Sequence, residues 1–155
     1  MPKTSESKVI LLNHIDPSHF ARTGVGCLVL SHDGKIVLQQ RDEDCQTFPG
    51  YLATFGGGIE ENESPIQALV RELREELGAD VKIRDVVSFG AIVEEERNYE
   101  ALVYLYFWHD KSNTITGCYE GKAEYYNDVS EIEKHPKIMG DVRWLLQECK
   151  KRKLL

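Results

Sequence analysis

One segment near the middle of the chain constrains the fold most, because it specifies a single capped, amphipathic helix. Ser64 is a typical N-cap, Pro65 suits the first helical position, and Gln67 completes a capping box with Ser64. Gly78 then ends the pattern as a C-terminal cap. Between the caps, apolar residues recur at helical spacing in one stripe: Ile66, Leu69, Val70, Leu73 and Leu77. The sequence therefore predicts a helix between these caps that packs one face on a core.

The rest of the chain predicts strands on both sides of this helix. They are expected at Val9–Leu12, Gly24–Ser31, Lys35–Arg41, Val81–Ile83, Val86–Glu94, Ala101–Trp108 and Ala123–Asn127. Asp33-Gly34 favours a hairpin between the second and third of them. Thr54–Ile59 contains Gly56-Gly57-Gly58, where the backbone can adopt unusual angles or approach a ligand closely. Glu94–Glu96 ends a strand and has two interpretations, a position near a functional site and a solvated loop, of which the solvated loop is favoured. Two more helices are expected at Val129–Lys134 and Asp141–Lys151. We therefore expect one domain over residues 1–155, of the α/β (α+β) class with a mixed sheet, and a flexible arm at 1–8.

Composition and charge narrow the class of protein. Of the 155 residues, 41% are hydrophobic and 29% are charged, which is the balance of a folded globular domain. The formal net charge of −7 argues against a nucleic-acid polymer as partner. No apolar run is long enough to span a bilayer, and the polar start of the chain lacks the apolar core of a signal peptide. The four cysteines show no C-x-x-C spacing, so we expect reduced thiols, a cytoplasmic protein and no membrane partner.

The predicted central helix carries an unusual concentration of acid. Glu72 and Glu76 lie about 40° apart on its surface, at about 100° per residue, and Glu75 lies within one turn of both. Like charges at this spacing destabilise a helix by about 0.2–0.5 kcal/mol per pair. One interpretation is a solvated face on which Arg71 and Arg74 balance the glutamates. The other is a set of hard oxygen ligands beside a glycine-rich loop, suited to Mg²⁺ or Mn²⁺ bound with substrate phosphates.

The order of residues in this region favours the second interpretation. Gly57 is followed after five residues by Glu63, and after seven more by Arg-Glu-Leu-Arg-Glu-Glu-Leu-Gly-Ala at positions 71–79. This order resembles the Nudix box, G-x(5)-E-x(7)-R-E-U-x-E-E-x-G-U, where U is a bulky aliphatic residue. Ala79 is smaller than the bulky aliphatic residue usual at the last position of the box. This difference affects the packing at that position and not the chemistry. The resemblance implies a hydrolase of nucleoside diphosphates linked to a further group, built as an α/β/α sandwich with a mixed sheet and a catalytic loop-helix-loop.

The resemblance also implies roles for individual residues. Mg²⁺ or Mn²⁺ is the expected cofactor, and its expected ligands are the Gly56 backbone carbonyl, Glu72, Glu75 and Glu76. Arg71 is expected to orient the carboxylates by charge-assisted hydrogen bonds, with Glu63 as its ion-pair partner. The general base is left open among Glu72, Glu75 and Glu120, and Glu120 is equally consistent with an ordinary loop acid. Substrate contacts are expected from Arg41, Tyr51, Gly57 and Gly58.

The class of substrate is narrowed by the absence of a proline after the box. Family members that act on ADP-ribose carry a proline soon after the box, whereas here none lies between Pro65 and Pro136. The expected substrate is therefore a nucleoside triphosphate, oxidised forms included. Two alternatives on the same fold stay open: a non-catalytic nucleotide-sensing module and an isoprenoid diphosphate isomerase. The oligomeric state is also open, with a homodimer as one option.

Overall fold

The structure is a computed structural model that describes residues 7–155. Most of the expected arm at residues 1–8 therefore lies outside the described residues. The two arm residues that are described make backbone contacts: the Glu96 amide donates to Ser7 Oγ (3.0 Å), and the Glu95 amide donates to the Lys8 carbonyl (2.9 Å). This short segment leads directly into the first strand.

Within residues 7–155 the chain forms eight strands and three α-helices. The strands are β1 (Val9–Leu11), β2 (Arg22–Leu30), β3 (Ile36–Gln40), β4 (Leu52–Ala53), β5 (Phe55–Gly58), β6 (Val86–Glu94), β7 (Ala101–His109) and β8 (Lys122–Tyr126). The helices are α1 (Pro65–Leu77), α2 (Val129–Glu133) and α3 (Gly140–Lys151). Three 3₁₀ turns connect them: η1 (Pro17–His19), η2 (Ile83–Asp85) and η3 (Glu95–Arg97). None of the helices in this part of the chain is long and apolar enough to cross a membrane.

The strands form one mixed sheet in the order β1-β6-β7-β2-β3-β4, with β5 paired to β2 and β8 paired to β3. β2 and β7 run parallel, whereas the other strand pairs are antiparallel. The predicted hairpin joins β2 to β3, and Gly34 adopts the positive φ of 84° that such a turn favours. Along one edge of β2, β5 pairs with the first half and β3 with the end.

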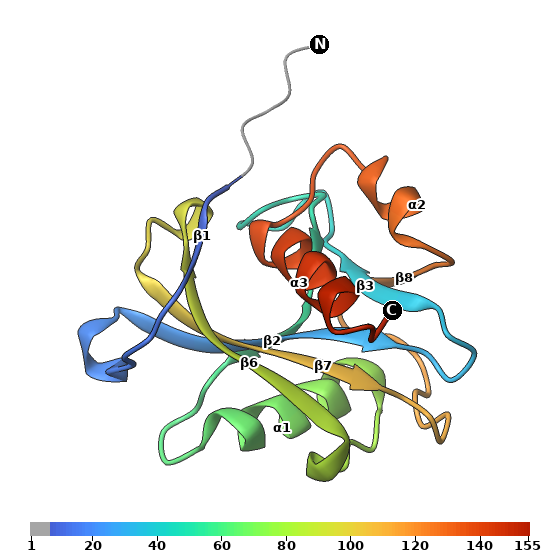
Figure 1. The fold of residues 1–155 in the computed structure, drawn as a ribbon, viewed down its shortest axis with the longest axis horizontal. Helices are drawn as coiled ribbons and strands as arrows, with labels where there is room; N and C mark the ends of the chain where they lie inside the picture. Colours follow the sequence, from blue (N-terminus) through green and yellow to red (C-terminus); the bar gives the residue numbers. More distant parts are fainter. Residues whose placement is uncertain (1–6) are drawn as a thin grey trace.

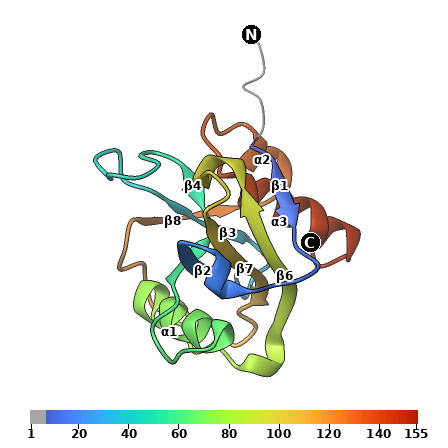
Figure 2. The ribbon, with the colours of Figure 1, turned by 90° about the vertical axis from the view of Figure 1, so that its left-hand side faces the viewer.

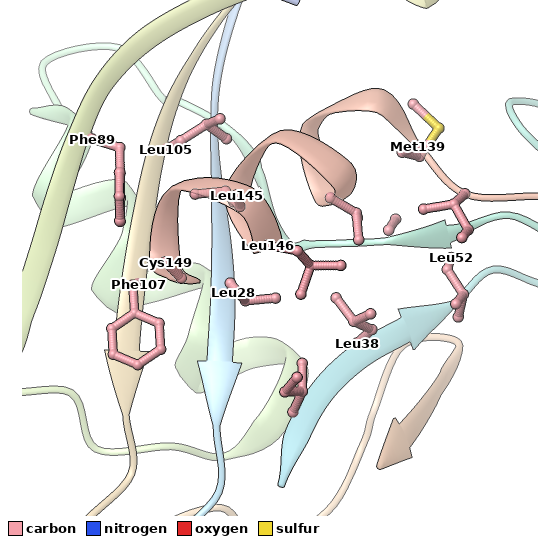
Figure 3. Close-up of a cluster of buried hydrophobic side chains, with 14 of the residues drawn as sticks. Leu28, Leu38, Leu52, Phe89, Leu105, Phe107, Met139, Leu145, Leu146 and Cys149 are labelled. Carbon is pink, nitrogen blue, oxygen red and sulfur yellow. The ribbon is translucent and has the colours of Figure 1, made fainter. Parts of the chain in front are cut away.

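Helices α1 and α3 cover opposite faces of the sheet (Figures 1 and 2). The α1 face encloses a hydrophobic cluster that includes Leu69, Leu73, Leu77 and Ala79. The α3 face encloses a second cluster, drawn in Figure 3, that includes Leu28, Leu105, Leu145, Leu146 and Cys149. Each fully buried leucine contributes about 1.5–3 kcal/mol relative to exposure. The predicted α/β/α layers and mixed sheet are therefore confirmed, and all four cysteines are free thiols.

Helix α1 begins and ends at its predicted caps. The Gln67 amide donates to Ser64 Oγ (3.3 Å), and the Ser64 amide donates to Gln67 Oε1 (2.9 Å). Gly78 adopts φ 65°, and its amide donates to the Arg74 carbonyl. These caps fix the rotation of the helix, and so decide which of its acidic residues face the sheet.

The predicted strand Val81–Ile83 is wrong. The Val81 side chain is buried in the α1 cluster, but Ile83 is 58% exposed and begins the 3₁₀ turn η2. The backbone next to this stretch bonds to a loop, since the Asp80 amide donates to Thr114 Oγ1 (3.0 Å). A short apolar run fits a strand or a loop equally well when only one of its residues enters the core.

Candidate active site

Helix α1 carries the acidic residues of the box to the sheet. Its apolar stripe packs on the sheet, so positions beside the stripe are drawn inside as well. Glu72 and Glu76 are 9% and 1% exposed, whereas the Glu75 side chain is 58% exposed. The three glutamates are therefore not equivalent, because two are buried and one faces solvent.

Arg71 connects these acidic residues to each other and to the glycine loop. Its Nε and Nη2 donate to the two carboxylate oxygens of Glu63 at 2.8 and 2.9 Å. Its Nη1 donates to Glu72 Oε1 (2.8 Å) and Glu75 Oε2 (3.3 Å), and Nη2 also donates to the Gly58 carbonyl (2.9 Å). The hydrogen bonds that Arg71 and Glu63 share raise the pKa of the guanidinium and lower the pKa of Glu63 to about 2. The expected ion pair is present, and the orienting role of Arg71 stays a prediction.

Glu76 is buried with an incomplete set of partners. The Gly56 amide donates to its Oε1 (3.2 Å), whereas its Oε2 is buried and makes no hydrogen bond to any described residue. Burial, the contact with Glu72 and the negative charge of Glu120 together raise the pKa of Glu76 to about 9. An unpaired buried carboxyl oxygen is destabilising. A cation bound there would satisfy this oxygen and favour the ionised carboxylate.

Glycines in β5 allow the backbone to pass close to these carboxylates. Gly56 adopts φ 149°, and a Cβ at this position would overlap the Val25 carbonyl oxygen. A Cβ on Gly57 would lie 2.6 Å from Glu72 Oε1. The β5 backbone therefore requires glycine at Gly56, whereas at Gly57 a side chain would displace only the Glu72 carboxylate, which lies directly against the strand.

The chemistry of these donors fits a hard divalent cation. Carboxylate and carbonyl oxygens are the ligands that Mg²⁺ and Mn²⁺ prefer, and Glu76 Oε2 is already desolvated. Across residues 7–155, however, no three acidic, histidine or cysteine side chains converge as a ready-made metal site. Glu72 and Glu75 are both directed to Arg71. A full ligand set therefore requires these side chains to turn, or water and substrate phosphates to supply the remaining oxygens.

A cavity of about 240 Å³ adjoins the same glycines. Its apolar wall includes Ala101 and Val103, which belong to the α3 cluster, so the cavity lies on the α3 face of the sheet. The charged and polar residues that line it are Arg22, Thr23, Gln39, Arg41, Thr54, Arg97 and Asp141. Gly56, Gly57 and Gly58 line it as well, so a ligand in the cavity can reach the backbone against which Glu72 packs. The cavity suits a small phosphate-bearing molecule, because arginine binds phosphate well.

Comparison with known proteins places the chain in a family. Residues 21–145 match the NUDIX domain. CTP pyrophosphohydrolase of Escherichia coli (strain K12) is 33% identical over 118 residues, which cover 74% of this chain and 82% of that protein. The chain belongs to the Nudix hydrolase family.

Two further matches show what this Nudix hydrolase is similar to. Nucleoside triphosphatase NudI of Escherichia coli O139:H28 is 38% identical over 63 residues, 41% of this chain and 45% of that protein. A solved structure of a bifunctional NMN adenylyltransferase/ADP ribose pyrophosphatase from Francisella tularensis, complexed with AMP and an Mn ion, shares the fold. It has a TM-score of 0.60 at 21% identity and covers 83% of this chain and 42% of that chain. With the family match and the CTP pyrophosphohydrolase, these similarities identify a Nudix pyrophosphohydrolase.

The predicted substrate contacts of this Nudix hydrolase separate into two groups. Arg41, Gly57 and Gly58 line the cavity. Tyr51 does not; its ring packs edge-on against Phe48, with centroids 5.7 Å apart, and joins the α3 cluster. Tyr51 therefore packs against the core, and its expected contact with the substrate stays a prediction.

Glu120 lies on an exposed loop beside the buried glutamates. The Tyr119 amide donates to the Glu76 carbonyl (2.8 Å), and Gln39 Nε2 donates to the Glu120 carbonyl (3.0 Å). The loop is therefore tied to α1 and to β3, and the Glu120 charge raises the pKa of Glu76. This position is compatible with a catalytic Glu120, which stays a prediction.

The sequence pattern did not identify the acidic group at the start of α3. The interpretation of Glu94–Glu96 as a solvated loop is wrong for Glu94, which is fully buried. Arg97 Nε donates to Glu94 Oε1 (2.8 Å), and the Asp141 amide donates to Glu94 Oε2 (3.1 Å). Strand β6 ends where α3 begins, so the two acids meet although they are far apart in sequence. The one available signal was Asp141 in the first turn of a predicted helix.

Proposed function

We propose that this Nudix hydrolase uses Mg²⁺ or Mn²⁺ to hydrolyse a phosphoanhydride bond of a nucleoside triphosphate, oxidised forms included. The observation that carries the proposal is the buried, unpartnered oxygen of Glu76 beside Glu72, at a glycine strand that also lines a cavity. Relatives named CTP pyrophosphohydrolase and nucleoside triphosphatase support this substrate class. Their names also support hydrolysis over the sensing and isomerase alternatives.

Each part of the site has a physical task in this reaction. A divalent cation held at this site would supply positive charge to the phosphate oxygens and favour deprotonation of the attacking water. Glu72 and Glu76 would hold the cation, with Glu75 and the Gly56 carbonyl as further ligands, and Arg71 would keep Glu72 in place. The arginines of the cavity bind the substrate phosphates. A carboxylate, which is Glu72, Glu75 or Glu120, takes the proton of the attacking water.

The first test compares nucleotide substrates. We expect kcat/KM for the best nucleoside triphosphate to exceed that for ADP-ribose by at least about tenfold, or about 1.4 kcal/mol in transition-state binding. The reason is that family members acting on ADP-ribose carry a proline soon after the box, whereas this chain has no proline between Pro65 and Pro136. The measurement is a panel of nucleotides assayed with and without Mg²⁺, with identification of the products. A reversed ranking, or hydrolysis that is indifferent to metal, contradicts the proposal.

The second test concerns Glu120. If its carboxylate completes the metal site or accepts the proton, Glu120→Gln should lower kcat by at least about tenfold and change the Mg²⁺ titration. Glu124→Gln is a matched control, because Glu124 is also exposed and lies four residues further on, in β8. Equal rates and equal Mg²⁺ titrations for the two variants would make Glu120 an ordinary loop acid.

A further inference from the structure

One loop holds two of the arginines that line the cavity. The loop, residues 42–50, lies between β3 and β4, and Arg41 directly precedes it. Arg41 Nε donates to the Thr47 carbonyl (3.0 Å), and its Nη2 donates to Thr47 Oγ1 (3.0 Å) and to Cys45 Sγ (3.5 Å). Two of the three guanidinium nitrogens are therefore fixed by the loop, in an orientation that is set before any ligand enters the cavity.

The second arginine lies against the next residue of the same loop. The Arg97 guanidinium lies over the Phe48 ring, 5.2 Å from the ring centroid. The Phe48 ring is itself supported edge-on by Tyr51, with centroids 5.7 Å apart. Arg97 Nε also donates to Glu94 Oε1 (2.8 Å), so this guanidinium is held by a ring and by a carboxylate. Two adjacent loop residues, Thr47 and Phe48, thus contact cavity arginines that come from separate parts of the chain.

Phe48 has a backbone conformation that bulky residues rarely adopt. Its φ is 47°, in the left-handed region. Backbone hydrogen bonds close the loop around it, because the Gly50 amide donates to the Asp42 carbonyl (3.3 Å) and the Tyr51 amide donates to the Phe48 carbonyl (3.3 Å). Such strain persists where the surrounding structure fixes it, and it is concentrated at functional sites. The strained residue is the one whose ring contacts Arg97, which indicates that the position of this ring matters to the cavity.

The partners of Arg41 leave its positive charge unpaired. They are a carbonyl, a hydroxyl and a thiol, and no carboxylate within residues 7–155 forms an ion pair with this guanidinium. Arg71 differs, because several glutamates of the box are bonded to it. A guanidinium has five N–H donors, and the Nη1 group of Arg41 makes no hydrogen bond in the described part of the chain. Arg41 therefore offers both charge and free donors to an anion in the cavity.

We infer that Thr47 and Phe48 are positioning residues that hold Arg41 and Arg97 in place for the phosphates of the substrate. An arginine that is fixed before the ligand arrives loses less side-chain freedom on binding, so the contacts to the loop raise the affinity for phosphate. Neither loop residue lines the cavity, so each acts through its arginine and not by touching the substrate. The inference rests on the proposed function, because the phosphates belong to the same nucleotide.

The test of Thr47 removes one acceptor and keeps the shape of the side chain. Thr47→Val lacks the hydroxyl that Arg41 contacts, whereas Thr47→Ser keeps it. We expect KM for the best nucleoside triphosphate to rise at least about threefold in Thr47→Val, with kcat within about twofold of the parent, because binding is weakened equally in the ground state and the transition state. The KM of Thr47→Ser should equal that of the parent. An unchanged KM in Thr47→Val, or a loss of kcat without a rise in KM, overturns the inference.

Gln46→Ala is the matched control for Thr47→Val. Gln46 is the exposed neighbour of Thr47 in the same loop, and its side chain makes no hydrogen bond within residues 7–155. Its replacement should therefore leave KM and kcat unchanged. A rise in KM equal to that of Thr47→Val would assign the effect to the loop in general and overturn the role of the Thr47 hydroxyl.

The test of Phe48 separates the face of the ring from apolar packing. Phe48→Leu keeps an apolar side chain beside the α3 cluster but removes the ring over which Arg97 lies, whereas Phe48→Tyr keeps the ring. We expect KM to rise at least about threefold in Phe48→Leu and to stay within about twofold of the parent in Phe48→Tyr. A parent-like KM in Phe48→Leu overturns the role of Phe48. Phe48→Met, a second apolar side chain without a ring, takes its place where Phe48→Leu fails to fold.

A binding measurement separates this inference from the proposed function. Inorganic triphosphate is titrated against the metal-free parent and variants, where no hydrolysis is required. We expect Kd to rise at least about threefold in Thr47→Val and in Phe48→Leu, and to be unchanged in Gln46→Ala. If the protein hydrolyses no nucleoside triphosphate, the proposed function fails while this titration still decides the inference. If it hydrolyses them but the parent and all variants bind triphosphate equally, or none binds it, the inference fails and the proposed function stands.

Discussion

Replacing Glu76 with Gln is expected to lower the rate of hydrolysis by at least about 100-fold, which is about 2.7 kcal/mol of transition-state stabilisation. A neutral amide is a poor ligand for a hard divalent cation, and Gln has nearly the shape and helix propensity of Glu. The stabilisation conferred by added Mg²⁺ or Mn²⁺ should shrink in parallel, because it grows with the logarithm of metal concentration over Kd. Phosphate release and thermal melts with and without metal measure both effects.

The stability of the metal-free variant should move in the opposite direction. The pKa of Glu76 is raised from 4.5 to about 9 in the folded protein, mainly by burial, so the folded state holds more protons than the unfolded state between these values. The free energy of unfolding of the parent therefore falls as the pH rises through this window, and Gln removes the effect. Glu76→Gln should equal the parent below about pH 4.5 and exceed it increasingly towards about pH 9.

The control for Glu76→Gln is Glu133→Gln, which changes an exposed acid on α2. It should leave hydrolysis, the metal-dependent thermal shift and the pH dependence of stability unchanged. If Glu76→Gln retains near-parental hydrolysis and an undiminished metal shift, the metal site lies elsewhere in the molecule. If it loses activity together with a large loss of metal-free stability, Glu76 supports the fold and not the reaction.

The parts of the site that lie close together in the sequence could be predicted from it. The caps Ser64 and Gly78 define α1 by local hydrogen bonding, and the spacing within the helix then places Arg71, Glu72 and Glu76 on adjoining positions. The hairpin between β2 and β3 is equally local. The difference in exposure between Glu75 and Glu76 could be predicted only if the side of α1 that meets the sheet was known.

The cavity could not be predicted in the same way, because its residues come from distant elements. Asp141 lines the cavity, and its hydrogen-bond partner Glu94 is 47 residues away; only the packing of α3 beside the end of β6 brings the two together. Acidic side chains are seldom buried in folded proteins, so the sequence alone predicts that Glu94 faces solvent. Tyr51 shows the converse, because an aromatic residue near a glycine turn fits a binding site or a core equally well until the packing is known.

Gly57→Ala is expected to lower hydrolysis by about 100-fold with little loss of stability. A Cβ at Gly57 would lie 2.6 Å from Oε1 and 2.8 Å from Oε2 of Glu72, so the carboxylate must move aside. The displaced group is the end of a flexible side chain, and Gly57 is not among the glycines with positive φ, so the backbone tolerates alanine. The free energy of unfolding should therefore change by less than about 1 kcal/mol.

Gly58→Ala is the matched comparison for Gly57→Ala. At this neighbouring position the nearest atom to a new Cβ is the Thr23 carbonyl oxygen at 4.0 Å, so Glu72 is left in place. The metal-dependent thermal shift should therefore persist in Gly58→Ala and be lost in Gly57→Ala, because only the latter displaces Glu72, a proposed metal ligand. Equal loss of the shift in both variants would mean that crowding of the β5 loop, and not the position of the Glu72 carboxylate, limits metal binding. A full metal shift in Gly57→Ala would remove Glu72 from the proposed ligand set.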